Sequence, residues 1–351
     1  MKKYLEVYDK IKKEIISGFY KAGDKIPSKR VMADLTGFSQ ITVMNAYSLL
    51  EAEGYIEARE RSGYFVCKLD VIPFLDDIKP VKKLEVKSEV YGDEFEFSLW
   101  FKTVRKVISE NDRELFVKAP TEGCAVLRNA ISDYLHRYRG MIAPPERIII
   151  GSGSEQLYET AVKILGKDKI YGIEEPSYNQ IERVYNDCGV SLRKLKMGSE
   201  GILSEELDRE RVGVLHVTPF SSFPSGVTAS AKKRYEYLSY AYAGDTYIIE
   251  DDFASEFFMP GNPIQSLYGL SGGDRVIYIN TFSKSLSPAM RIGYMIIPES
   301  LIDKYKEKTK GYSCSVPVLD QYVLSEFIAS GSFERHLSRV RRKMNKSEGK
   351  L

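Results

Sequence analysis

"RVIYINTFSKSLSPAMRIGYMIIP", residues 275–298, contains two short apolar runs separated by a polar turn. The runs 276–279 and 292–297 have the length and composition of buried strands. Lys284 therefore lies just beyond the end of the first strand, and Arg291 follows seven positions later. Open sheets of mostly parallel strands bind ligands beyond the carboxyl ends of their strands. The stretch thus predicts a ligand site that uses an amine and a guanidinium.

Further apolar runs of strand length occur from residue 94 onward, and helical stretches separate them. Helices are expected near 155–165 and 177–187. The other strands are expected at 147–151, 169–176, 212–219 and 246–252. This alternation is typical of a sheet with helices on both faces. The larger part of the chain is therefore predicted to be an α/β domain with a mostly parallel sheet.

Polar residues follow three of these strands. "GSGSEQL" (151–157) joins a strand to a helix, whose free N–H groups suit a phosphate. "EEPSYNQ" (174–180) offers Tyr178, and "IIEDDF" (248–253) offers carboxylates that need a cation when buried. Taken singly, the Gly/Ser turn is a weak signal, and Tyr178 is better explained as an ordinary surface or core tyrosine. Together with Lys284, the clusters match a ligand that has a phosphate, a flat ring, a protonatable ring nitrogen and an aldehyde.

Pyridoxal 5'-phosphate (PLP) has all four groups, so we expect it as the cofactor. Lys284 would form the Schiff base, Asp251 would pair with the ring nitrogen, and Tyr178 would stack on the ring. The phosphate would meet a helix start, two hydroxyls and the guanidinium. The phosphate-binding residues are expected to be Ser154, Glu155, Gln156, Thr281, Ser283 and Arg291.

The first 68 residues have a different pattern. Helical spacing of apolar residues over 3–17 ends at Gly18. Ser28 can cap a short helix that turns Val31, Met32 and Leu35 inward and ends at Gly37, and Ser39 can cap the next helix. Two short helices joined by a tight turn form a helix-turn-helix unit, and "YIEARERSGYFVC" (55–67) alternates like a hairpin.

Gln40, Thr42 and Asn45 would face outward at the start of the second helix of this unit, where base edges are read. Residues 1–68 carry 12 Lys/Arg against 9 Asp/Glu, which weakly favours a polyanionic partner. The same pattern is compatible with a small helical domain that has a solvated polar face.

Composition excludes several other classes. The 43% hydrophobic and 28% charged residues are typical of soluble globular proteins. No apolar run is long enough to span a membrane, and the N-terminus has no signal-peptide pattern, so we expect a cytoplasmic protein. Four cysteines without a CxxC pair and three scattered histidines argue against a zinc site or a histidine-based triad. No metal is expected.

The order of the N-terminal motifs resembles the GntR-type winged helix-turn-helix. The matching stretches are "GDKIPSKR", "ITVMNAYSLLEAEGYIE" and "SGYFV". This resemblance implies binding of double-stranded operator DNA. The implied DNA contacts are Ser28, Lys29, Arg30, Ser39, Gln40, Thr42, Asn45, Arg61 and Gly63. Gln40 stands where many members have Arg, and Gln prefers adenine while Arg prefers guanine, so we expect a shifted operator preference.

Residues 94–345 resemble the class I/II (fold-type I) aminotransferase domain of MocR-type GntR regulators. The resemblance is carried by "TEGCAVLRNAISDYLHRYRG", "IIIGSGSEQL", "EEPSY", "YIIEDDFASEF" and the stretch quoted first. It implies a winged helix at 1–68, a linker at 69–93 and a PLP-binding domain at 94–351. It also implies a homodimer. Relatives continue into a small C-terminal subdomain, so the chain is expected to be C-terminally truncated.

The sequence departs from that family pattern in the predicted site as well. Phe253 replaces a tyrosine, and Ser221 and Ser222 replace longer hydrogen-bonding residues. We therefore expect a transcriptional regulator that senses PLP or an amino compound, without net catalysis. An active PLP-dependent aminotransferase with an attached DNA-binding domain is the alternative. A paralogue that binds DNA but no cofactor is a third.

Overall fold

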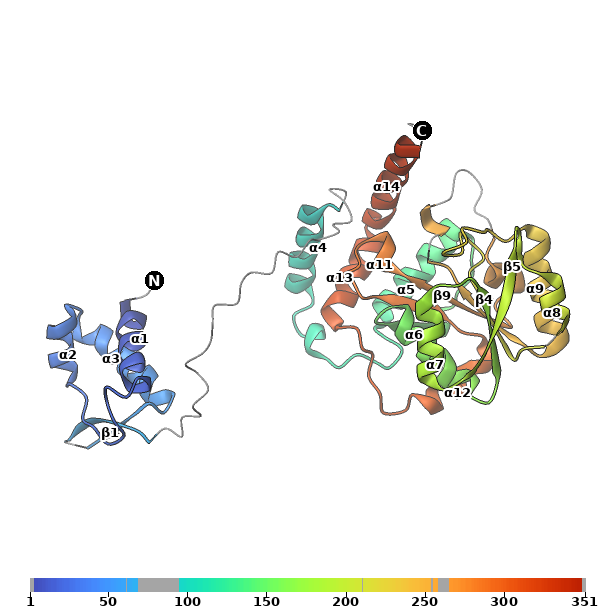
Figure 1. The fold of residues 1–351 in the computed structure, drawn as a ribbon. Coiled ribbons are helices and arrows are strands. Elements are labelled where there is room, and N and C mark those ends of the chain that lie inside the picture. Colours follow the sequence, from blue (N-terminus) through green and yellow to red (C-terminus); the bar gives the residue numbers. More distant parts are fainter. Residues whose placement is uncertain are drawn as a thin grey trace. The chain divides into compact units, whose positions relative to one another are not determined.

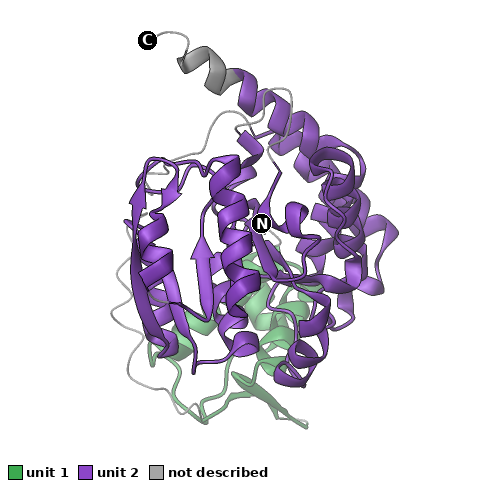
Figure 2. Cartoon of the chain, turned by 90° about the vertical axis from the view of Figure 1, so that its right-hand side faces the viewer, with its two compact units in different colours: residues 1–88 green, residues 89–351 purple. Residues whose placement is uncertain are grey.

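The computed structural model describes residues 3–60, 62–68, 95–209, 211–253, 255–257 and 265–348. The chain forms two compact units, Met1–Ser88 and Glu89–Leu351, which Figure 2 colours separately. The boundary lies within the predicted linker 69–93, which is outside the described residues. Among the described residues, no helix is both long and apolar enough to cross a membrane.

The smaller unit has three helices followed by a hairpin, as predicted. Its elements are α1 (Lys3–Ile16), α2 (Lys29–Thr36), α3 (Gln40–Ala52), β1 (Ile56–Arg59) and β2 (Gly63–Val66). The Ser28 hydroxyl accepts a hydrogen bond from the Val31 N–H at 3.3 Å, and Gly37 ends α2 in the left-handed conformation. Ser39 caps α3 by accepting from the Thr42 N–H at 3.2 Å. These caps fix where the two helices begin.

The core of this unit confirms the predicted stripe on α3, whose residues Val43, Ala46, Tyr47 and Leu50 are buried with the apolar side of α1. The prediction for α2 was partly wrong. Met32 is buried, but Val31 and Leu35 are 48% and 66% exposed.

The buried face of α2 is shifted by one residue and consists of Met32, Ala33 and the half-buried Thr36. Thr36 can lie there because its hydroxyl donates to the Met32 carbonyl at 2.7 Å. A hydrophobic pattern that counts threonine as polar misplaces this face.

The larger unit is built on an eight-stranded sheet with the order β3-β10-β9-β8-β7-β4-β5-β6. The central strands run parallel, whereas β10 is antiparallel to both of its neighbours. The strands are β3 (Ile148–Gly151), β4 (Ile170–Glu175), β5 (Ser191–Gly198), β6 (Gly201–Ile202), β7 (Val214–Val217), β8 (Tyr247–Asp251), β9 (Val276–Thr281) and β10 (Gly293–Ile296). The predicted mostly parallel α/β sheet is confirmed, and β5 and β6 are additional to the predicted strands.

Helices cover both faces of this sheet (Figure 1). The α-helices are α4 (Phe97–Glu110), α5 (Ala125–Tyr134), α6 (Ser154–Leu165), α7 (Asn179–Cys188), α8 (Ser204–Arg209), α9 (Ala231–Gly244), α10 (Leu267–Ser271), α11 (Phe282–Ser285), α12 (Ile302–Lys308), α13 (Val318–Ala329) and α14 (Ser332–Glu348). The short turns are η1 (Glu114–Phe116), η2 (Leu135–Arg139), η3 (Pro145–Arg147), η4 (Ser255–Phe257) and η5 (Glu299–Leu301). Alternate strand residues, such as Ile248 and Ile249, enter two separate cores. One core contains α5, α9 and α13, and the other contains α6, α7 and α12.

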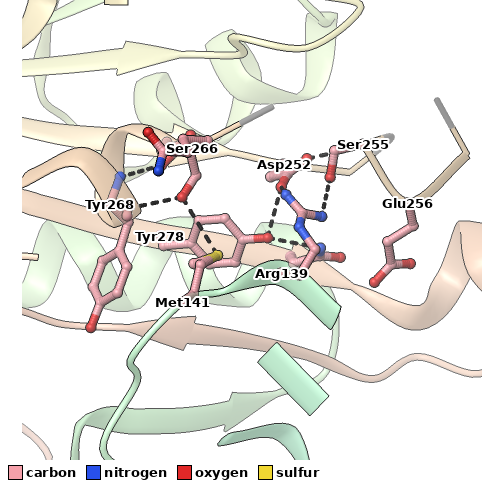
Figure 3. A network of polar contacts seen from close by, with 12 residues as sticks. Arg139, Met141, Asp252, Ser255, Glu256, Ser266, Tyr268 and Tyr278 are labelled. Carbon is pink, nitrogen blue, oxygen red and sulfur yellow. Dashed lines mark hydrogen bonds and ion pairs between the residues drawn. The ribbon is translucent and has the colours of Figure 1, made fainter. Parts of the chain in front are cut away.

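A buried polar network anchors the segment that follows β8 (Figure 3). Arg139 pairs with Asp252 at 2.8 Å and donates to the Ser255 hydroxyl. The Tyr278 hydroxyl also donates to Asp252, at 2.7 Å. Glu256 lies in the same buried region, where desolvation raises its pKa to about 7. The network therefore fixes the backbone on either side of Phe253.

A second buried carboxylate ties β4 to the loop after β7. Glu174 accepts hydrogen bonds from the Thr218 N–H at 3.1 Å and from the Ser222 hydroxyl at 2.6 Å. Its burial raises the pKa of the carboxyl group to about 7. The folded protein therefore holds the Glu174 proton more tightly than the unfolded chain does.

This difference predicts a pH-dependent stability. The pKa of Glu174 is raised on folding. As pH rises from the ordinary pKa of a glutamate toward 7, the folded protein is therefore increasingly destabilised relative to the unfolded chain, and this loss of stability is complete above pH 7. Between a pH of about 5.5 and about 7.5, the free energy of unfolding should fall by roughly 2 kcal/mol through this group. In urea unfolding, the free energy of unfolding of Glu174→Gln should fall less than that of the wild type over this pH range, and the difference should be about that amount.

The matched control is Glu175→Gln, because Glu175 is the exposed neighbour on the same strand. This control should keep the wild-type pH profile. If Glu174→Gln keeps it too, the carboxyl group of Glu174 is not protonated in the folded state.

Candidate functional site

A cavity of about 350 Å³ opens at the carboxyl ends of the parallel strands. Asp251 ends β8, Thr281 ends β9, and Thr218 follows β7. The lining residues are Ser154, Tyr158, Tyr178, Ile181, Thr218, Phe223, Asp251, Phe253, Thr281, Ser283, Lys284 and Pro288. The fold thus brings polar side chains from distant segments to one edge of the sheet, as expected for an open α/β sheet.

Most residues of the predicted cofactor set line this one cavity. They are Ser154, Tyr178, Asp251, Thr281, Ser283 and Lys284. Glu155, Gln156 and Arg291 are not among its lining residues. The Gln156 side chain instead accepts a hydrogen bond from the Ser152 N–H at 3.1 Å, so it stabilises the turn that precedes α6.

Asp251 is buried with only one of its two oxygens bonded. Its Oδ2 accepts a hydrogen bond from the Tyr158 hydroxyl and lies 3.9 Å from Nε2 of His216. Its Oδ1 has no hydrogen-bond partner within the described part of the chain. A buried carboxylate oxygen without a partner costs about 1–3 kcal/mol or more. A ligand N–H that carries positive charge would offset that cost, so the site fits a protonated ring nitrogen.

Tyr158 holds this carboxylate by a hydrogen bond, His216 lies beside it, and the sequence pattern missed both. The Tyr185 hydroxyl lies 2.7 Å from Nδ1 of His216 and fixes the imidazole ring. Tyr158 lies one helical turn after Ser154 on α6, and this spacing placed it on the same helix face as the predicted residue. His216 lies inside β7, and nothing in the sequence pattern around it indicates that it lies beside Asp251.

Lys284 projects from α11 into an apolar part of the cavity. Its Nζ lies 4.5 Å from the ring centroid of Phe253 and 5.9 Å from that of Phe257. Burial lowers the pKa of Lys284. Across the described ranges, no carboxylate forms an ion pair with this amine. These surroundings favour the neutral amine, which is the nucleophilic form.

An aromatic pair lines one side of the cavity, and a glycine and an arginine lie next to its lining residue Ser154. Tyr178 packs edge-on against Phe223, with ring centroids 6.0 Å apart. Gly153 precedes α6 with φ of 105°, and a Cβ atom there would lie 2.6 Å from Nη2 of Arg291. The loop therefore needs glycine to let the guanidinium approach the helix start. Arg291 is paired with the exposed Glu155 at 3.0 Å, an ion pair that a phosphate can replace.

In the smaller unit, the described members of the predicted contact set lie on or just before α2 and α3 and in the hairpin. Gln40 and Asn45 are exposed on α3, whereas the Thr42 hydroxyl lies 2.9 Å from that of its cap, Ser39. Ser28 likewise serves as a cap. The two serines and Thr42 thus order the helix starts.

The basic and wing residues lie at the start of α2 and in the hairpin. Nζ of Lys29 lies 5.1 Å from the ring centroid of Tyr64, and Arg30 is exposed on the same turn as Lys29. Gly63 opens β2 with φ of 104°. Arg61 lies outside the described residues. Lys29 and the hairpin are therefore in contact within one unit.

Comparison with protein families gives two matches in chain order. The family described as bacterial regulatory proteins, gntR family, matches residues 3–66. Aminotransferase class I and II matches residues 92–348.

Curated relatives cover nearly the whole chain. An uncharacterized HTH-type transcriptional regulator, YdeL of Bacillus subtilis, is 32% identical over 97% of this chain and 76% of its own length. The probable rhizopine catabolism regulatory protein MocR of Rhizobium meliloti is 29% identical over 96% of this chain and 74% of its own. The pyridoxine biosynthesis regulator PdxR of Corynebacterium glutamicum is 28% identical over 96% and 75%.

Solved structures resemble the chain over the part that holds the larger unit. Pyrococcus horikoshii kynurenine aminotransferase, solved in complex with PMP, is 25% identical with a TM-score of 0.65. The α-aminoadipate aminotransferase LysN of Thermus thermophilus is 26% identical with a TM-score of 0.63. Each match covers 71% of this chain and 64% of the solved chain. With these matches, the fold is that of the fold-type I aminotransferases. The chain belongs to the MocR-type branch of the GntR regulators, in which a helix-turn-helix domain precedes an aminotransferase class I and II domain.

Proposed function

We propose that this chain regulates transcription by binding operator DNA with residues 1–68 and PLP with residues 94–351. Residues 69–93 act as the linker. The observation that carries the proposal is the convergence of Lys284 and Asp251, from different strand ends, on one cavity. Bound PLP supplies an aldehyde that reacts reversibly with amines and a ring that withdraws electrons. Membership of a DNA-binding family supports action in the cytoplasm, as a homodimer.

Each side of the cavity has a role toward this cofactor. Lys284 provides the amine, and Oδ1 of Asp251 accepts the N–H of the protonated ring. Tyr178 covers the ring face. The phosphate is held by Ser154, Glu155, Gln156, Thr281, Ser283 and Arg291. Among these, Gln156 acts by ordering the loop before α6, and Glu155 acts by releasing Arg291 when the phosphate binds.

Sensing follows from competition for one reactive group. With PLP bound, Lys284 and an amino compound would compete for the aldehyde, and a displaced Lys284 amine would lie beside the rings of Phe253 and Phe257. Arg139 anchors the segment that carries these rings. A free or a cofactor-bound Lys284 would therefore contact a part of the fold that is held in place. A ligand with different affinity for two conformations shifts their populations and thereby changes DNA binding.

An active aminotransferase is the second candidate, favoured by the likeness to the kynurenine enzyme. Repeated turnover of an amino acid and a keto acid by the PLP-loaded chain would support it. Phe253, in the position where the family resemblance implies a tyrosine, supports the sensor because no phenol lies there to hydrogen-bond the cofactor.

Replacement of the lysine tests cofactor binding. The chain mixed with PLP should develop a visible absorption band, and borohydride reduction should fix the cofactor mass on the peptide that contains Lys284. Lys284→Ala should lose both signals, because the amine that forms the covalent bond is gone. Lys310→Ala, which changes an exposed lysine, should keep them. Equal labelling of Lys284→Ala would contradict the assignment.

Salt dependence tests DNA binding. Duplexes enriched by the chain from a random pool should be bound with a log–log salt slope of about −0.9 for each phosphate contact. Lys29→Ala and Arg30→Ala should each flatten that slope by about 0.9 and weaken binding to all DNA sequences by a similar factor. Lys10→Ala, on the exposed side of α1, is the control and should leave the slope unchanged. Failure to enrich any duplex, or a flat salt response, would remove the regulator function.

A further inference from the structure

The solvent-exposed face of α3 carries apolar side chains in addition to the polar residues predicted to contact DNA. Ile41 is 68% exposed and Met44 is 41% exposed. Both lie in the first two turns of the helix, between the exposed residues Gln40 and Asn45. The Ser39 cap holds this end of the helix in place.

Helical geometry places Ile41 at the centre of that face. Successive residues are rotated by about 100°. The buried residues of α3 are Val43, Ala46, Tyr47 and Leu50. The direction opposite to their mean is that of Ile41, with Met44 and Asn45 on either side. An amphipathic helix normally has polar residues there, and adjacent exposed apolar residues mark a binding surface.

The chemistry of this face matches one kind of base pair. In the major groove, an A·T pair presents the N7 and N6 groups of adenine and, on the same edge, the C5-methyl group of thymine. An amide side chain suits the adenine, and an apolar side chain suits the methyl group. Gln40 and Asn45 supply amides beside Ile41 and Met44, so α3 offers both kinds of contact along one face.

Neighbouring charge favours DNA over a protein as the partner of this face. Lys29 and Arg30 lie at the start of α2, the other helix of the helix-turn-helix, where Arg30 is exposed and Lys29 is half-buried. Positive side chains beside an exposed recognition helix suit a phosphate backbone. The apolar pair is thus continuous with the DNA-contacting surface put forward above.

We infer that Ile41 and Met44 determine operator specificity by packing on thymine methyl groups in the major groove. Together with the amides of Gln40 and Asn45, they select A·T pairs at the centre of each half-site. This inference rests on the proposed DNA binding and adds the base-reading role of two apolar residues.

Deoxyuridine differs from thymidine only by the missing methyl group, and this difference provides the test. The full chain is used to enrich duplexes from a random pool, and each thymine of the enriched duplex is then replaced singly by deoxyuridine. Dissociation constants are compared by fluorescence anisotropy at one fixed salt concentration. Replacement at a contacted position should weaken wild-type binding roughly fourfold, the effect of one buried methyl group.

Two alanine variants complete the cycle. Ile41→Ala/Met44→Ala should bind the thymine duplex more weakly and lose the thymine–deoxyuridine difference at those positions. Alanine is a good helix former, and circular dichroism checks that the unit remains folded. Phe19→Ala, which changes a 72% exposed side chain outside the helix-turn-helix, should keep the full difference.

The outcomes separate the inference from the proposed function. If no duplex is enriched, both fail. If a duplex is bound with a steep salt slope but no deoxyuridine replacement matters, DNA binding stands and the inference is overturned. It is also overturned if the double variant keeps the wild-type difference. A double variant that keeps this difference and dissociates in sedimentation would assign the face to contact between two copies of the chain.

Discussion

The buried carboxylate of Asp251 is the constraint on which the larger unit depends. It lies at the end of β8, where Tyr158 satisfies one oxygen and the other has no partner in the described part of the chain. Such a group is unfavourable in an empty protein and favourable beside a cationic ring. The apolar surroundings of Lys284 act in the same direction, because burial lowers the pKa of the amine and makes its charged form less favourable. Both features reduce stability locally, at the positions where the proposed cofactor would bind.

The sequence was sufficient to predict the architecture and that several polar side chains gather around one cavity. Strand-length apolar runs gave the sheet, and polar residues just after them gave Lys284, Asp251 and Tyr178. The strand β5, which lies next to the edge strand β6, escaped prediction because Arg193, Lys194 and Lys196 interrupt its apolar residues and only Leu195 is buried. His216 and Tyr158 escaped because their role depends on which strand and helix lie side by side, and that is a property of the tertiary fold.

The smaller unit shows the same limit at finer scale. Capping serines and left-handed glycines marked the helix ends correctly, because these signals are local. The buried face of α2 was predicted one residue out of phase. The hydroxyl of Thr36 donates a hydrogen bond within the helix, so this polar residue can lie half-buried beside the core. The exposed apolar residues of α2 and α3 were consequently assigned to the interior or overlooked, although they form part of the surface.

The close approach of Arg291 to Gly153 restricts how the proposed phosphate site could be re-engineered. The positive φ of Gly153 makes any other residue strained at this position, and a side chain there would also displace the guanidinium of Arg291. New donors for a larger or differently charged ligand would have to come from the flanking serines, Ser152 and Ser154, or from a replacement of the arginine itself. Directed evolution of altered effector response should therefore find its productive substitutions beside this glycine and leave the glycine unchanged.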